Sequence, residues 1–518
     1  MTTTVVSPPT LGDERHVKPG VVLFVLCLAT YTILLDGSIV NVTLPTLVRE
    51  LGATTTDLKW IVDAYNLTFA ALVLAAGSLS DRYGRKAALT VGLGVFVAGN
   101  LAATQIDATG PLIAARATMG IGAALIFPAT LSIITNVFTD RAQRAKAIGI
   151  WGAMTGLGVA SGPIVGGWLV EHFWWGSVFA LVAVVAVFAT VAVVVAVPDS
   201  RDPEAPALDR AGLAISIVML GSLVVAIIEA PEWGWLSART LGLFALAAVA
   251  AVAFMVIERR QEHPMLDVKL FANPRFTAAS GAVTCAFFAL FGFIFLITQY
   301  FQFVRGYTPL QSGVRVLPVA ISIAIASITG TKLAVRFGNK QVVSLGLLFM
   351  SVAFAWISTA SAATPYIEIV GQMIFLGLGL GFTSAPATEA VMGAVPPNKA
   401  GQGSAVNDAT REVGGTLGIA VLGSVFASIY ASTIAKSAPW TALPDAAREA
   451  AADGLGLALG VIQQLGLGEE ASGVLVADAQ QAFLDGLSVA CLVAAGVTLI
   501  GSVVAARFLP SRPSAIDE

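Results

Sequence analysis

Long apolar stretches recur along almost the whole chain of 518 residues and are separated by short polar clusters. Each stretch is about 20 residues long, the length that an α-helix needs to cross the hydrocarbon core of a bilayer. Charged residues make up only 12% of the chain, whereas soluble domains hold about 25%. We therefore predict an all-α membrane protein with 14 transmembrane helices, at residues 20–41, 58–79, 86–104, 111–135, 145–169, 174–197, 211–230, 239–257, 276–303, 309–334, 341–361, 366–392, 402–431 and 482–508.

Basic residues predict which way these helices cross the membrane, because Lys and Arg collect on the cytoplasmic side. An even number of spans places both termini on one side. With cytoplasmic termini, 21 of the 29 Lys and Arg residues fall in inside segments, 7 fall outside, and Arg116 lies within a span. This excess predicts that both termini are cytoplasmic.

A weak internal repeat predicts how the spans are grouped. The segment Leu79–Lys86 (LSDRYGRK) is similar to Leu333–Lys340 (LAVRFGNK), 254 residues later, with Val335 where the first copy has Asp81. Two six-helix halves separated by two extra helices explain this offset, and repeated halves with a site between them are a common transporter plan. The expected organisation is an N-terminal tail 1–19, a six-helix bundle 20–197, two inserted helices with linkers 198–275, a second six-helix bundle 276–508, and a tail 509–518.

The longest connection, residues 432–481, lies on the outer side in this topology. Its alanines, two prolines and excess of acidic residues predict short surface helices. We favour a tolerated insertion over a role in binding substrate or a partner.

Three spans place ionisable residues inside the membrane, where a charge costs about 2.5–3.5 kcal/mol on insertion scales and marks a functional candidate. Asp36 follows the apolar run Val21–Leu35, and at 1.5 Å per residue it lies about 24 Å from Gly20. Asp63 and Arg116 lie near the outer ends of their spans, so all three are expected at a similar depth. We predict roles in proton coupling or substrate binding; the alternatives are structural pairing for Asp36 and Arg116, and simple solvation for Asp63.

Other polar and aromatic residues are weaker candidates. A cavity wall is one interpretation, while amides also join helices and aromatic residues also form interface belts; the candidates are Asn41, Trp60, Tyr65, Gln299 and Gln302. Glu229 and Glu232 are expected to be solvated at the outer end of the seventh span. A structural ion-pair network is expected where spans twelve and thirteen meet, from Glu389, Asp408, Arg411 and Glu412.

Glycines in the fifth span recur every four residues, at Gly158, Gly162 and Gly166, beside Pro163 and Gly167. Such a face allows very close helix packing, and a proline favours a bend because it removes one backbone hydrogen bond.

Several motifs resemble those of the major facilitator superfamily of transporters. Gly77–Lys86 (GSLSDRYGRK) resembles the loop motif of that family, and Gly158–Gly167 (GVASGPIVGG) resembles the motif of its exporters. Three further segments resemble motifs of its fourteen-helix drug:proton antiporters: Leu35–Pro45 (LDGSIVNVTLP, with Ser38 for a usual threonine and Thr43 for a usual alanine), Arg116–Ala124 (RATMGIGAA, with Met119 for a usual glutamine) and Asn407–Gly415 (NDATREVGG).

The resemblance implies two pseudo-symmetric bundles that rock around a central cavity. It implies that Asp36 and Arg116 serve proton coupling or substrate binding, and that Gly162 and Pro163 give the bend and close packing that favour export. It also implies a cytoplasmic latch between the bundles, formed by Gly77, Asp81, Arg82, Gly84, Arg85 and Lys86.

The favoured function is a proton-coupled exporter of amphipathic drugs in a bacterial inner membrane. The alternatives are an exporter of one endogenous lipid or secondary metabolite, and a transport-inactive sensor or scaffold. Three histidines without a triad or metal cluster argue against an enzyme, and the chain has no GxxxxGK[ST] loop for ATP. We expect no cofactor or metal, the proton gradient as the energy source, and small amphipathic substrates, protons and the lipid bilayer as partners, with no nucleic acid and no obligate protein partner.

Overall fold

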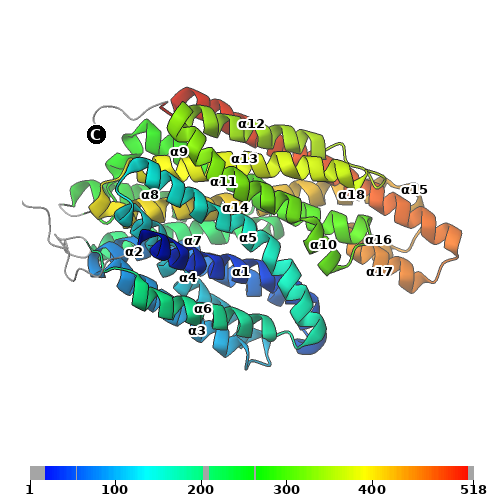
Figure 1. Ribbon diagram of the computed structural model, residues 1–518. Helices are drawn as coiled ribbons and strands as arrows, with labels where there is room; N and C mark the ends of the chain where they lie inside the picture. The colour runs from blue at the N-terminus through cyan, green and yellow to red at the C-terminus, as the bar shows by residue number, and fades with distance from the viewer. Residues whose placement is uncertain (1–17, 54, 202–208, 262–263, 511–518) are drawn as a thin grey trace, which may run out of the picture.

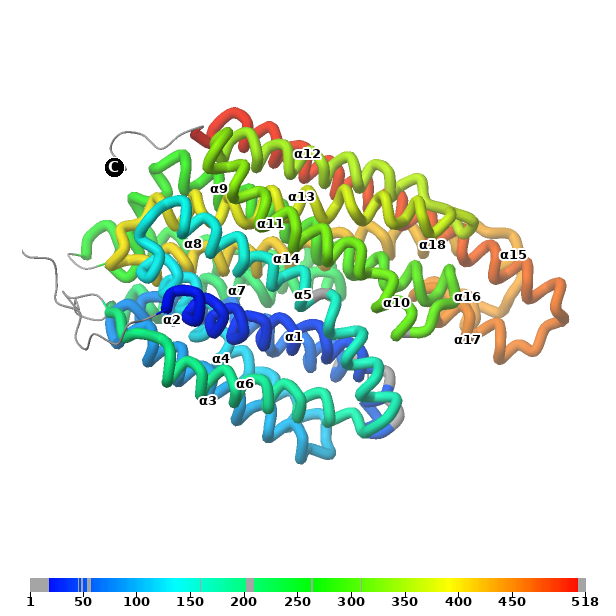
Figure 2. Tube along the Cα trace, viewed as in Figure 1, coloured from blue at the N-terminus to red at the C-terminus, as the bar shows by residue number. Residues whose placement is uncertain are grey.

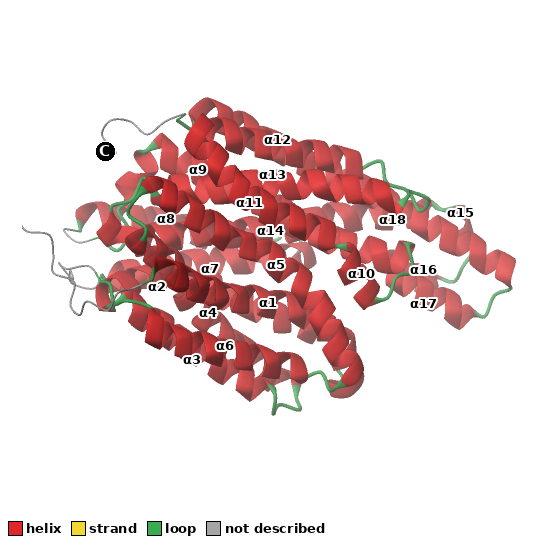
Figure 3. Ribbon diagram, in the orientation of Figure 1, coloured by secondary structure: helices red, strands yellow, loops and turns green. Residues whose placement is uncertain are grey.

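The computed structural model describes residues 18–510, except for residues 54, 202–208 and 262–263. Within these residues all regular structure is helical, without a strand, as Figure 3 shows. Fourteen of the helical segments are long and apolar enough to cross a membrane. The prediction of an all-α protein with fourteen spans is therefore confirmed.

The first six helices form one bundle, called the N-half here. Its members are α1 (Pro19–Leu51), α2 (Thr55–Tyr83), α3 (Arg85–Ala103), α4 (Thr109–Val137), α5 (Arg141–His172) and α6 (Ser177–Ala196). The helix α4 is the most enclosed span, because it packs against α1, α2 and α3. Of its most apolar segment of 18 residues, 78% is buried. Its central position lets a side chain on α4 reach several neighbours at once.

A hairpin of two helices, α7 (Arg210–Trp233) and α8 (Ala238–Arg260), follows the N-half. It packs on α2 of the N-half and on α14 of the second half. At its turn, Lys59 on α2 pairs with Glu229 and Glu232 of α7, and the Trp235 indole donates to Ser424 Oγ on α14 at 3.1 Å. The hairpin thus contacts both halves.

The remaining spans form the C-half, in which corresponding helices pack against one another as they do in the N-half. The elements are η1 (Val268–Ala272), α9 (Pro274–Gln299), η2 (Tyr300–Val304, a π-helical turn), α10 (Pro309–Arg315), α11 (Leu317–Phe337), α12 (Asn339–Ile357), α13 (Tyr366–Met392), η3 (Pro397–Lys399), α14 (Ala400–Lys436) and α18 (Glu469–Phe508). Short helices α15 (Ala438–Thr441), α16 (Asp445–Ala452) and α17 (Leu455–Leu465) connect α14 to α18.

The repeat noted in the sequence has a counterpart in backbone geometry. Gly84 ends the turn between α2 and α3 with φ 109°, and Gly338, 254 residues later, ends the turn between α11 and α12 with φ 95°. Glycine adopts such positive φ values without the steric cost that a side chain adds. The N-half and the C-half therefore use the same tight turn between corresponding helices.

Figures 1 and 2 show the two halves side by side, with the described chain beginning and ending at one end of the bundle. We call this the terminal end. The turns that follow α2 and α8, and the start of α14, lie there, whereas α15, α16 and α17 project from the opposite end.

Several helices differ in length from the predicted spans. The helix α1 continues to Leu51 and α18 begins at Glu469, so residues 469–481 of the predicted outer loop are helical. Hydropathy marks only the apolar part of a helix, whereas backbone hydrogen bonding continues through polar residues. The predicted span 309–334 is divided into α10 and α11 because Pro318 starts a new helix after Val316.

Candidate functional site

A buried ion pair joins α1 to α4 in the middle of the N-half. Asp36 is 0% exposed and Arg116 is 1% exposed. The Arg116 Nη1 atom lies 2.5 Å from Asp36 Oδ2, and its Nε donates to the carbonyl oxygen of Ile61 on α2 at 2.9 Å. The guanidinium also lies 4.5 Å from the ring centroid of Tyr65, at cation–π distance. Arg116 therefore ties three helices together.

Two polar atoms beside this pair have no partner. Asp36 Oδ1 and the Tyr65 hydroxyl are buried, and neither makes a hydrogen bond within the described part of the chain. A buried polar atom without a partner costs free energy, so these positions are chemically unsatisfied. The arrangement can therefore accept a proton on Asp36 or a polar group of a ligand.

The structure brings Asp36, Arg116 and Tyr65 together but does not bring Asp63 to them. Asp63 is half-buried one turn from Lys59, and no hydrogen bond or ion pair links it to Asp36 or Arg116 in the described ranges. Lys59 instead reaches Glu229 at 3.0 Å and Glu232 at 2.8 Å. The expectation that Glu229 is solvated is wrong: it is 5% exposed, because α7 packs this face against α2.

Among the described residues, no hydrogen bond or ring contact joins the other cavity candidates to the pair. Asn41 is exposed and donates to Gly37 O of its own helix at 3.2 Å, and Gln299 donates to Phe295 O of its own helix at 3.4 Å. Trp60 and Gln302 are half-buried.

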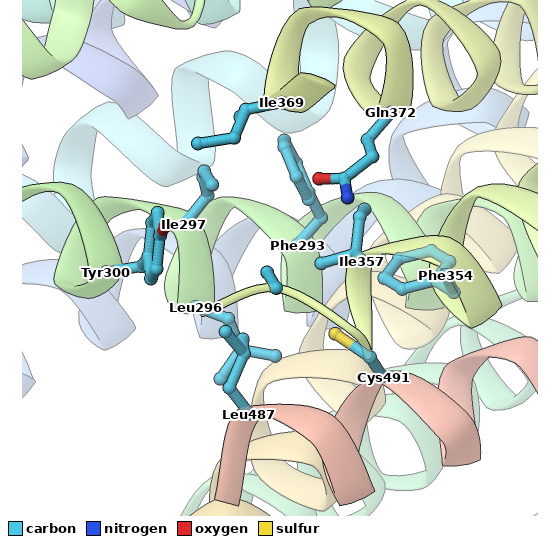
Figure 4. Close-up of a pocket in the computed structure, with 11 residues that line it drawn as sticks. Phe293, Leu296, Ile297, Tyr300, Phe354, Ile357, Ile369, Gln372, Leu487 and Cys491 are labelled. Atoms are coloured by element: carbon cyan, nitrogen blue, oxygen red, sulfur yellow. The ribbon is translucent and has the colours of Figure 1, made fainter. Parts of the chain in front are cut away.

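Figure 4 shows a small cavity in the C-half, among α9, α12, α13 and α18. Its volume is about 10 Å³, close to the smallest space that holds one water molecule. Its wall is mainly apolar and includes Phe293, Leu296 and Phe354. This region is therefore packed too tightly to hold a drug-sized ligand.

The charged turn after α2 is docked on the N-terminus of α14. Asp81 Oδ1 accepts from the backbone N–H of Gly401 at 3.0 Å, and Oδ2 accepts from that of Gln402 at 3.2 Å. The free N–H groups and the dipole at a helix N-terminus favour a carboxylate there. Asp81 therefore links the N-half to the C-half.

Arg85 and Gly77 complete this junction, which we call the latch. Arg85 is 1% exposed; its Nε and Nη2 donate to Asp81 Oδ1 at 2.9 and 2.7 Å, and Nη2 also donates to Pro397 O and Asn398 O. A Cβ on Gly77 would lie 2.5 Å from Gly401 O, so glycine allows the two helices to meet. Lys86 binds Val194 O of the N-half instead, and Arg82 lies at the end of α2 with its side chain over Tyr83.

A second junction at the terminal end was not expected from the sequence. Glu389 on α13 accepts from Asn339 at 2.8 Å and forms ion pairs with Arg141 at 3.5 Å and Arg275 at 3.7 Å. Arg141 begins α5, so this contact also joins the two halves. The prediction that Glu389 belongs to one network with Asp408, Arg411 and Glu412 is wrong, because α13 directs Glu389 toward α5 and α12.

Arg411 instead reaches an aromatic group that the sequence analysis missed. Its guanidinium lies 4.7 Å from the ring centroid of Trp151 on α5 and 4.9 Å from that of Phe287. The Trp151 indole donates to Thr30 Oγ1 of α1 at 2.8 Å. The signal available in the sequence was a tryptophan, Trp151, within a run of mostly small residues in α5.

The glycines of α5 form two faces. On one face, a Cβ at Gly162 would lie 2.6 Å from Ser38 Cβ of α1, and one at Gly166 would lie 2.7 Å from Ile39 Cγ1; Gly158 meets Leu34 on the same side. Ser38 Oγ donates to Gly158 O at 2.8 Å. This face therefore holds α1 close to α5, two residues from Asp36.

The other side of α5 contacts the C-half. A Cβ at Gly149 would lie 2.6 Å from Thr331 Oγ1 of α11. A Cβ at Gly313 of α10 would likewise lie 2.6 Å from Pro163 Cβ of α5. Gly167 lies against Leu310, where a Cβ would have an ordinary 3.6 Å contact. One helix thus packs closely on both halves.

For the latch we predict that Asp81→Asn slows transport turnover by roughly tenfold and leaves substrate affinity nearly unchanged. The reason is that Asn weakens the hydrogen bonds of residue 81 to α14, and hydrogen bonds to charged groups contribute about 1.5–3 kcal/mol each. Turnover and binding are measured on the same purified protein. Asp140→Asn is the matched control: Asp140 accepts from Gln143 N at 2.9 Å and caps α5 within its own half, and Asn also caps helices. A large loss of affinity at unchanged turnover would place Asp81 in the binding site instead.

Over the residues that the structure describes, no group of three or more His, Cys, Asp or Glu side chains is arranged to hold a metal ion. Several charged groups are instead paired, as Asp36 with Arg116 inside the N-half and Glu389 with Arg141 at the junction of the halves.

Fourteen membrane-spanning helices in two repeated halves, with a buried ion pair inside the first half, define a multi-pass membrane transporter rather than an enzyme. The chain belongs to the Major Facilitator Superfamily, whose family model matches residues 26–419.

Similar proteins agree with this assignment. The chain is 34% identical over 487 residues to the multidrug efflux pump LfrA of Mycolicibacterium smegmatis, covering 94% of this chain and 95% of that protein. It is 35% identical over 419 residues to the methylenomycin A resistance protein of Streptomyces coelicolor, covering 80% and 88%. The fold is similar to the crystal structure of the human organic anion transporter MFSD10, with a TM-score of 0.61 and 14% identity over 94% of this chain and 99% of that chain.

Proposed function

We propose that this transporter exports amphipathic drugs or related small molecules in exchange for protons, across a bacterial inner membrane and with both termini in the cytoplasm. The observation that carries the proposal is the fully buried Asp36–Arg116 pair, with Asp36 Oδ1 and the Tyr65 hydroxyl unsatisfied beside it. Relatives named for multidrug efflux and antibiotic resistance support the substrate class.

The pair supplies a means of coupling in this proposal. An ionised Asp36 is held by Arg116, whereas a protonated Asp36 loses most of that attraction. Protonation therefore frees Arg116 from α1 and changes how α1, α2 and α4 are held. A substrate that reaches the same site favours one of the two states, and differential affinity for two states is what shifts a conformational equilibrium.

The terminal end is the cytoplasmic end in this topology. The latch and the Glu389–Arg141 contact both lie there, so in this proposal the halves are joined on the cytoplasmic side. Opening that side requires both junctions to separate, and rocking of two repeats around a fixed site is the general plan for such carriers.

The test is transport into inverted membrane vesicles. An acidic vesicle interior is imposed, and accumulation of a cationic dye, a neutral antibiotic and an anionic dye is followed with and without a protonophore. We expect accumulation of several amphipathic compounds that collapses on adding the protonophore. Accumulation that is indifferent to the proton gradient would contradict proton coupling.

A dedicated exporter of one compound is the second candidate, because three relatives are named for resistance to a single antibiotic each. The same compound panel separates the two: transport of one compound and rejection of the rest favours the dedicated exporter.

A further inference from the structure

A large apolar cavity lies beside the inserted hairpin and apart from the Asp36–Arg116 pair. Its volume is about 890 Å³, and its wall is drawn from α2, α7, α8, η1, α9 and α14. Leu74, Met219, Phe254 and Val413 supply apolar surface from four different helices. A cavity of this size matches the pockets of about 300–1,000 Å³ that hold small-molecule ligands.

Some residues of the cavity wall are exposed at the surface of the protein. Met255 is 45% exposed and Phe271 is 44% exposed, although both line the cavity. The helix α8 is also the least enclosed span: only 22% of its most apolar segment of 18 residues is buried. Because α8 lines the cavity and is largely exposed, lipid surrounds this side of the cavity in a membrane.

Two cations, Arg259 and Lys269, stand at the rim of this cavity. Arg259 lies in the last turn of α8 and Lys269 in η1, so both are at the level where the hairpin leaves the membrane. Both are exposed, and neither has an ion-pair partner in the parts of the chain that the structure describes. Two acids of the described residues lie nearby: Asp267 pairs with Lys399 and accepts from the backbone N–H of Lys269, and the buried Glu258 accepts from Leu266 N.

We propose that this cavity binds one anionic phospholipid, with its acyl chains along the apolar wall and its phosphate between Arg259 and Lys269. Basic pockets between transmembrane helices at the cytoplasmic surface bind anionic headgroups in this way. The chemistry argues against a cationic dye, which the two cations repel. The site is separate from the proposed export pathway and does not depend on which compound is exported.

The position of the cavity gives the lipid a structural consequence. Leu74 lies one turn before Gly77 on α2, and Val406 follows Ala405 on α14, so the cavity wall adjoins the latch contact between these helices. A bound lipid therefore braces the hairpin against both halves next to the latch.

The test compares lipid retention by the purified full-length protein, using native mass spectrometry. Phosphatidylglycerol and phosphatidylcholine with identical acyl chains are the two probes. We expect Arg259→Gln/Lys269→Gln to reduce phosphatidylglycerol retention by about tenfold, since each basic residue near the membrane surface attracts anionic lipid. Arg336→Gln/Lys340→Gln is the matched control, because this pair lies at the terminal end outside the cavity and should change nothing.

A second variant separates the cavity from surface charge. Ala251→Trp fills the space beside Phe254 and keeps both cations, so we expect it to reduce retention of phosphatidylglycerol as well. Equal retention of the two lipids by the wild-type protein would overturn the proposal, as would unchanged phosphatidylglycerol retention in both variants. Displacement of the lipid by an exported dye would assign the cavity to substrate instead.

Discussion

Replacing Asp36 by Asn is expected to abolish export driven by a pH gradient while the protein still inserts in the membrane. Asn keeps the shape of the side chain but cannot carry a proton between states. The buried Asp36–Arg116 pair, with Oδ1 unsatisfied, then becomes a site that no longer titrates. Substrate-induced proton release from reconstituted protein is the decisive measurement, and we expect it to disappear.

Stability has to be controlled in this experiment, because removing one partner of a buried ion pair leaves the other uncompensated, at a cost of about 3–5 kcal/mol in soluble proteins. The double variant Asp36→Asn/Arg116→Gln removes both charges. We expect its thermal stability to recover relative to Asp36→Asn and its proton release to remain absent. Asp63→Asn is the matched single control, since Asp63 lies outside the pair, and it should release protons normally. Wild-type proton release by Asp36→Asn would move the coupling role elsewhere.

Gly162→Leu is expected to leave a normal amount of protein in the membrane and to stop export. A Cβ at this position would lie 2.6 Å from Ser38 Cβ and 2.7 Å from Ser38 C, which is closer than non-bonded carbon atoms approach. Overpacking of this kind costs about 1–3 kcal/mol and forces backbone shifts. The shift falls on α1, two residues from Asp36, so we expect it to disturb the contact of Asp36 with Arg116.

Further variants test whether the loss of export depends on the size of the side chain at position 162. Gly162→Ala should already lose part of the export activity, because its Cβ meets Ser38, but less than Gly162→Leu, which adds three further carbon atoms. Gly94→Leu is the matched control on α3, where a Cβ would have no neighbour within 4 Å, and it should export normally. Full export by Gly162→Leu at normal abundance would show that α1 and α5 do not need this close approach.

The spans were predictable because each needs a long run of apolar residues, and that requirement is visible in the sequence. The pairing of Asp36 with Arg116 was only suggested, since depth along each span brings two residues to one level without showing which faces meet. Asp63 shows this limit: at a similar expected depth, its side of α2 faces away from Asp36.

Other parts of the site depend on contacts between distant segments that a single sequence does not encode. Glu229 is buried only because α7 packs on α2, and Glu389 turns to Arg141 rather than to Arg411. The Trp151 contact with Arg411 likewise joins residues from different halves. The charge of each residue was readable from the sequence, but its partner was not.

The hairpin α7–α8 crosses the membrane twice and returns the chain to the end from which it left. The C-half therefore keeps the same orientation whether the hairpin is present or not. Gain or loss of this hairpin during evolution leaves the orientation of every other span unchanged. A protein with twelve spans and one with fourteen can therefore share the same two halves. A single helix added at the same linker would instead invert every span that follows it.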